Sequence, residues 1–162
     1  MLAEELGEKN IMYNIAAIVD NLGPSQSSFY LIKQFNDLIK SVDYSPVCFY
    51  NNITNPVVTP FFSCMNASGL SSFEGLAIST SIETAGLLLN TSSKVDRCMY
   101  VWDLEWLRTP LDFENSISIF RHPNLKIIAR SQSHKDIIEN YTNKKVSGIV
   151  EDWKVKDLVN II

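Results

Sequence analysis

Two carboxylates and two indoles stand close together near the middle of this chain, where they could do chemistry together. Asp103 and Glu105 lie between Trp102 and Trp106, at the end of an apolar stretch. A carboxylate can take the proton of a hydroxyl, and indole faces beside carboxylates suit sugar hydroxyls. The segment with Asp103, Glu105 and Trp106 is therefore a candidate site for a ligand that carries hydroxyls. The alternative is that the tryptophans fill gaps in the core and that the acids are solvated.

A polar turn follows the first strongly apolar stretch. It contains Asn21, Gly23 and Ser25 within residues 20–28. Its polar side chains, with the N–H groups at the start of the next helix, could line an anionic or sugar ligand. The same residues would also make an ordinary capped connection between a strand and a helix.

A third polar segment holds Ser131 and His134, one of only two histidines in the chain. A neutral imidazole near a helix N-terminus could act as a hydrogen-bond donor or as a base. A surface histidine close to a helix cap is the alternative. Glu151, Asp152 and Trp153 follow the last apolar run and repeat the combination of carboxylates with an indole.

Short apolar runs and stretches of helical periodicity alternate along the chain and would position these loops. Thr80 and Glu83 form a Thr-x-x-Glu capping box, which predicts a helix start. The expected strands are 14–20, 46–50, 59–65, 75–79, 96–102, 125–129 and 146–150; the expected helices are 28–42, 80–89, 112–120, 131–141 and 155–162.

This alternation predicts an α/β fold, a three-layer α/β/α Rossmann-like domain with a mostly parallel sheet of about six or seven strands. Residues 12–162 are expected to form a single domain, and residues 1–11 are interpreted as an N-terminal extension that is frayed or disordered. In such sheets, ligands bind beyond the carboxyl ends of the strands. The three polar segments should therefore meet at one rim.

Composition excludes several other classes of protein. Fourteen Lys and Arg against 18 Asp and Glu give a net charge of −4, and no basic run exceeds Lys144–Lys145, so a nucleic-acid partner is not expected. No apolar window is long enough for a membrane span, and the acidic start does not resemble a signal peptide, which favours a cytoplasmic location. Cys48, Cys64 and Cys98 are interpreted as buried reduced thiols, with no metal site and no cofactor. P-loop, GxGxxG and GxSxG motifs are missing.

Four segments together resemble the N-terminal half of GT-B-type glycosyltransferases. They are the opening strand and loop at 15–24, the strand ending in polar residues at 99–103, the strand followed by serine at 126–131, and the closing segment at 146–152. The resemblance covers nearly the whole chain. In that family the N-terminal domain mainly binds the acceptor, while the nucleotide-sugar sits largely on a second Rossmann domain.

The resemblance implies a chain that recognises a sugar or a glycosylated acceptor and transfers a glycosyl group only with a separate donor-binding domain or chain. Asp103 would take the proton of the acceptor hydroxyl, and the loops at 21–27, 103–106 and 131–134 would bind the acceptor. The alternative is a non-catalytic Rossmann-like binding or assembly module, with a homo-oligomer as one form of it, because Trp and Tyr also dominate protein interfaces.

Overall fold

A sheet of parallel strands organises the chain. The computed structural model describes residues 12–91, 94–109 and 112–162. Its strands are β1 (Tyr13–Val19), β2 (Tyr44–Tyr50), β3 (Ser63–Asn66), β4 (Gly75–Ser79), β5 (Val95–Val101), β6 (Lys126–Ala129) and β7 (Gly148–Ile149). The helices are α1 (Gln26–Leu38), α2 (Ile82–Leu89), α3 (Phe113–Phe120), α4 (Gln132–Thr142) and α5 (Val155–Ile161), with 3-10 turns η1 (Ala67–Ser72) and η2 (Glu105–Leu107).

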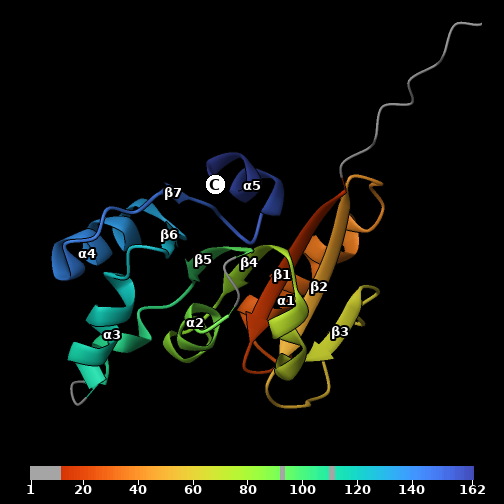
Figure 1. Cartoon of the computed structure of the whole chain (residues 1–162), viewed down its shortest axis with the longest axis horizontal. Helices are drawn as coiled ribbons and strands as arrows, with labels where there is room; N and C mark the ends of the chain where they lie inside the picture. The colour runs from red at the N-terminus through yellow and green to blue at the C-terminus, as the bar shows by residue number, and fades with distance from the viewer. Residues whose placement is uncertain (1–11, 92–93, 110–111) are drawn as a thin grey trace, which may run out of the picture.

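The seven strands pair in the order β3-β2-β1-β4-β5-β6-β7, and every pairing is parallel. Figure 1 shows this order across the view, from β7 and β6 on the left to β3 on the right. The expected Rossmann-like architecture is confirmed.

Both faces of the sheet are covered by helices. Successive residues of β1 point to opposite faces, so Ala17 joins one hydrophobic cluster while Ala16 and Ile18 join the other. Helices α1 and α5 pack into the first cluster, and α2, α3 and α4 pack into the second. Continuous apolar runs form the central strands because both of their faces are buried.

Three serine caps begin the helices that follow β1, β4 and β6. The side chains of Ser25, Ser81 and Ser131 each accept a backbone N–H from the residue three positions later. The expected capping box at Thr80 and Glu83 is wrong by one residue, because Ser81 caps α2 and pairs with Thr84. Thr80 instead donates its hydroxyl to the Ile18 carbonyl and ties β4 to β1.

Helix α1 ends earlier than the expected residue 42. After Leu38 the N–H groups of Lys40 and Ser41 donate to carbonyls only three residues back, which closes the helix, and Val42 is 74% exposed. The third strand begins at Ser63 rather than at 59, since Pro60 has no N–H to give to a sheet.

The described residues also test the expectations for the cysteines and for a membrane span. Cys48 and Cys98 are buried, as expected, but Cys64 is exposed because it lies on edge strand β3. None of the helices described is both long and apolar enough to cross a membrane. The expectation for residues 1–11 lies outside the described residues.

Close packing of β1 against β4 requires glycine at position 75. Its φ is +136°, and a Cβ there would stand 2.5 Å from the Asn14 carbonyl oxygen. Only glycine meets both conditions without strain. By contrast, a Cβ on Gly86 in α2 would meet no atom within 4 Å.

We therefore expect Gly75→Ala to lower the free energy of unfolding by about 3 kcal/mol, through backbone strain and overlap. The matched Gly86→Ala should raise it by about 0.5–1 kcal/mol, because alanine favours a helix. Urea unfolding of both variants measures the difference. Equal stability of the two variants would contradict the assigned packing of β1 and β4.

Candidate functional site

A crevice opens at the carboxyl ends of β1, β4, β5 and β6. Strands β1 and β4 are neighbours, yet the helices that follow them pack on opposite faces of the sheet. The loops leaving these strands therefore diverge, which is where parallel sheets bind ligands. The crevice has a volume of about 530 Å³ and is lined by residues that follow all four strands.

Four of the expected site residues come together on its wall: Asn21, Ser25, Asp103 and Glu105. The convergence of the first and middle polar segments is thus observed. Gly23 is not among the lining residues; it is buried in the turn, where its N–H donates to Asn21 Oδ1. Its place is structural, because it lets the turn fold back on Asn21.

The indoles lie differently from the expectation. Trp106 is 1% exposed and packs against the rings of Phe113 and Phe120, so it offers no open ring face to a sugar. Trp153 is fully buried and donates its indole N–H to Ser27 Oγ. Trp106 therefore fills the core, as the alternative had it, while Asp103 and Glu105 beside it remain exposed.

Ser131 and His134 line a separate hollow of about 350 Å³, together with Arg130, Glu151 and Asp152. Ser131 accepts the His134 backbone N–H and so acts as the cap of α4. His134 Nδ1 is buried with no hydrogen-bond partner in the described structure. Arg130 lines both this hollow and the crevice, so the third polar segment adjoins the other two at one rim.

Arg130 is the functional candidate that the sequence did not single out. Its guanidinium lies 3.8 Å from the centre of the Trp102 ring, and a donor nitrogen is 3.4 Å from Gln26 Oε1. Among the described residues no carboxylate lies within 4 Å of it. A guanidinium held against an indole with donors unused can bind a ligand oxygen or an anion. Its position directly after β6, at the carboxyl end of a parallel strand, is the feature of the sequence that could have identified it.

Two carboxylates on the crevice wall are held by neighbours. Asp20 accepts hydrogen bonds from the side-chain amides of Asn21 and Asn52, at 2.8 and 2.9 Å. Asp103 lies just beyond β5, 3.6 Å from the Arg108 guanidinium. Both side chains are thereby oriented, although they remain accessible to solvent.

Glu105 is electrostatically different. Desolvation by its surroundings raises its pKa above the ordinary value of 4.5, and the nearby charge of Asp103 adds to the effect. The backbone N–H of Ile82 and the charge of Arg108 oppose the shift. Glu105 therefore holds its proton more readily than a free glutamate.

A second cavity of about 750 Å³ adjoins the crevice and shares Asp20, Ser81 and Glu105 with it. Trp106 lines this cavity rather than the crevice. No group of three or more His, Cys, Asp or Glu side chains suited to holding a metal ion occurs in the ranges the structure describes. The polar side chains that line the crevice and this cavity are mainly hydroxyls, amides, carboxylates and one guanidinium.

Comparison with known proteins gives no relative. No family model, no curated protein and no solved structure matches this chain. What the chain does is therefore inferred from the fold and from the chemistry of the crevice.

The raised pKa of Glu105 leads to a pH-dependent prediction. Because the folded state binds this proton more tightly than the unfolded state, the charged carboxylate opposes folding once the pH rises above the folded pKa. Glu105→Gln should therefore make the protein more stable than the unmodified chain at neutral pH, by about 0.5 kcal/mol or less because solvent screens the site. The gain should disappear as the pH falls below 4.5.

Thermal unfolding across this pH range measures the effect. Glu114→Gln is the control, since it removes an exposed carboxylate from the first turn of α3, outside both cavities. If Glu105→Gln changed stability equally at every pH, desolvation of Glu105 would not be its cause.

Proposed function

We propose that this chain is the acceptor-binding half of a glycosyltransferase-like enzyme. It binds a sugar or a glycosylated acceptor in the crevice and depends on a separate domain or chain for the nucleotide-sugar. The observation that supports this most is the crevice itself, where the hydroxyls, amide and carboxylates that follow β1, β4 and β5 face one guanidinium after β6. Such mixed donors and acceptors match the alternating hydroxyls of a sugar.

The N-terminus of α1 adds donors to this site. Ser25, Gln26 and Ser27 line the crevice at the start of the helix. The first N–H groups of a helix have no partner within the helix, and the helix dipole makes this end positive. Ligand oxygens that approach Arg130 would meet these N–H groups at the same end of the crevice.

Asp103 would serve as the base that takes the proton of the acceptor hydroxyl. Its carboxylate is exposed on the crevice wall, and Arg108 lies beside it. A base must reach the hydroxyl within hydrogen-bond distance, and this position leaves it open to a bound sugar. The departing diphosphate needs several positive groups, whereas Arg130 is the one Lys or Arg among the described residues of the crevice wall. Donor phosphates are therefore assigned to the partner domain.

One feature favours the alternative, a non-catalytic assembly module. All four residues of edge strand β3 are exposed, Phe61 just before it is 72% exposed, and Met65 within it is 48% exposed. An open strand edge with apolar side chains can pair with a second copy of the chain. A sugar-binding half should be stabilised by its ligand, whereas an assembly module should be stabilised by association with a second copy.

Simple glycosides should raise the melting temperature of the full chain by about 4 °C at ten times the dissociation constant, since binding then adds about 1.4 kcal/mol. Nucleoside diphosphates alone should leave the melting temperature unchanged. Arg130→Lys should weaken glycoside binding about tenfold, because lysine cannot lie flat on Trp102 and present a planar set of donors. The control is Arg121→Lys, which changes an arginine at the end of α3, outside the crevice wall.

No stabilisation by any glycoside or nucleotide-sugar, combined with dimerisation that depends on protein concentration, would contradict the transferase proposal and favour assembly. In that case Met65→Lys on the open edge should abolish the dimer.

A further inference from the structure

The two edges of the sheet are built differently. Strand β7 forms one edge and has only two residues, and the Ile161 side chain of α5 lies 2.6 Å from where a Cβ on Gly148 would stand. Short strands and covered edges are common ways of preventing a sheet from pairing with another chain. Strand β3 forms the other edge, and all four of its residues are exposed. The β3 edge is therefore open to a further strand.

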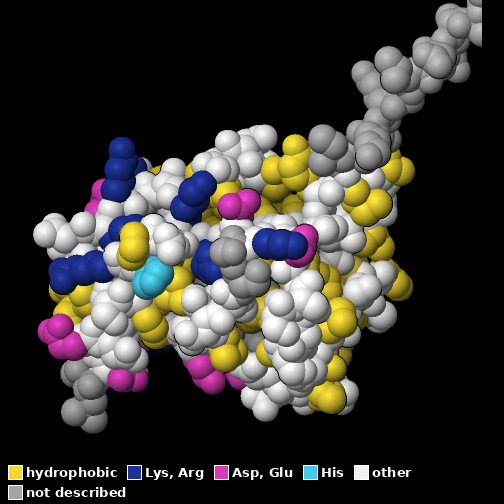
Figure 2. Space-filling model, viewed as in Figure 1, with side chains coloured by type: hydrophobic (Ala, Val, Ile, Leu, Met, Phe, Trp, Pro, Cys, Tyr) yellow, Lys and Arg dark blue, Asp and Glu magenta, His cyan; other side chains and the backbone are white. Residues whose placement is uncertain are grey.

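The chain around this open edge carries no charge. Residues 44–73, which include β2 and β3, contain no Asp, Glu, Lys, Arg or His, although 20% of the whole chain is charged. In Figure 2 the charged side chains lie on the left and in the middle of the view, and hydrophobic side chains mark the right-hand margin, where Figure 1 places β2 and β3. Charged side chains, lysine above all, commonly protect an exposed edge strand. Residues 44–73 lack this protection.

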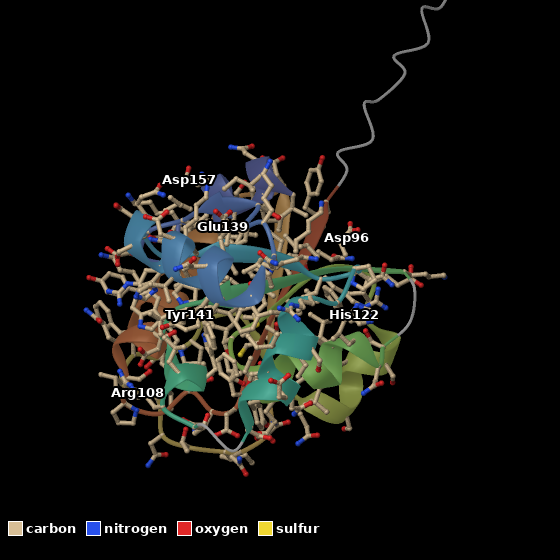
Figure 3. All side chains as sticks on the ribbon, turned by 90° about the vertical axis from the view of Figure 1, so that its left-hand side faces the viewer. Asp96, Arg108, His122, Glu139, Tyr141 and Asp157 are labelled. Atoms are coloured by element: carbon tan, nitrogen blue, oxygen red, sulfur yellow. The ribbon has the colours of Figure 1, made fainter. Side chains whose placement is uncertain are left out.

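The opposite end of the sheet shows the contrast. Figure 3 looks at that end, where Arg108, Glu139 and Asp157 are among the labelled side chains. The whole chain has a net charge of −4, so two copies repel each other when their charged surfaces approach. The face formed by residues 44–73 is where a second copy meets the least repulsion.

Apolar side chains beside the edge add surface that can be buried. Ile53, Val57 and Phe61, in the connection from β2 to β3, are 84%, 58% and 72% exposed, and Met65 within β3 is 48% exposed. Covering such side chains is the main favourable contribution to protein association. A hollow of about 170 Å³ opens on the same connection, with Ile53 on its wall. The connection thus offers both protruding apolar side chains and a hollow that can receive one.

We propose that the β3 edge binds a second copy of this chain, with the two β3 strands antiparallel across a two-fold axis. The sheets of the two copies then continue into one another. Near such an axis each residue lies beside its own copy, so a charge there would face a like charge. Residues 44–73 avoid this repulsion because they hold no charge. None of the described residues that line the crevice lies within 44–73, so the dimer leaves the crevice open and does not depend on the proposed function.

A different partner fits this face less well. A strongly acidic or basic protein would find no opposite charge on residues 44–73. Pairing of four strand residues is also too small on its own for a specific interface, which buries about 1,200–2,000 Å². The partner must therefore cover Ile53, Val57 and Phe61 as well. A second copy does so with the same apolar side chains, and each copy supplies both the side chains and the hollow.

The test is the mass of the full chain in solution, measured by analytical ultracentrifugation over a range of protein concentrations. We expect a reversible dimer. Met65→Lys and Met65→Glu should each weaken dimerisation at least about tenfold, because each variant places like charges across the axis. An equal mixture of the two variants should restore the dimer, because lysine then faces glutamate. The control is Leu87→Lys, which changes an exposed leucine of α2 and should leave the dimer unchanged.

Cys64 provides an independent reporter of the same contact. Among the three cysteines it is the exposed one, and it lies within β3. A short bifunctional maleimide should join two copies through Cys64. Cys64→Ser should prevent this link while the dimer persists, and Met65→Lys should lower the yield of linked dimer.

A chain that stays monomeric at every concentration would overturn the proposal. A dimer that Met65→Lys and Leu87→Lys weaken equally, or one that the mixture of lysine and glutamate variants fails to restore, would also overturn it. Glycoside binding in the crevice should be the same for Met65→Lys and for the unmodified chain. Loss of the dimer and failure of the proposed function are therefore separate results.

Discussion

The adjacency of β1 and β4 is the constraint on which the rest of the structure depends. Parallel strands need right-handed crossovers, so a chain that builds β2 on one side of β1 and β5 on the far side of β4 must send α1 and α2 to opposite faces. Their starting loops cannot pack on each other. The crevice is therefore a consequence of strand order. Each serine cap at its wall satisfies one N–H group of its helix N-terminus and leaves others open to a ligand.

The far end of the rim is fixed by aromatic packing. Tyr100 donates its hydroxyl to the Val150 carbonyl, and Trp153 stacks edge-on against Tyr100 at 4.7 Å. In the turn after Val150, Asp152 and Trp153 have φ values of 46° and 57°, a left-handed conformation that is uncommon for residues other than glycine. Burial of the Trp153 indole stabilises this turn, which keeps Asp152 beside Arg130 in the smaller hollow.

The sequence was sufficient for much of the fold because most strands are buried on both faces. The predicted strand at 75–79 matches β4, and the polar turns with Ser25 and Ser131 precede α1 and α4 as expected, whereas the cap of α2 was predicted one residue too early. Edge strands were harder, since β3 has no buried face to leave a pattern. For the site, the loops could be predicted but not the direction of their side chains. Trp106 and Glu105 are neighbours in sequence, yet one is buried and the other is exposed.

The burial of Trp106 and the exposure of its neighbour Glu105 connect the core with the rim. In η2 the indole of Trp106 turns inward against Phe113 and Phe120, and this packing turns the adjacent Glu105 toward the two cavities. The packing of Trp106 in the core therefore fixes the position of the Glu105 carboxylate. In that position the carboxylate is partly desolvated. An unpaired indole N–H and a carboxylate that resists ionisation both oppose folding of the free chain. The same short turn, η2, therefore completes one side of the core and places a carboxylate at the rim.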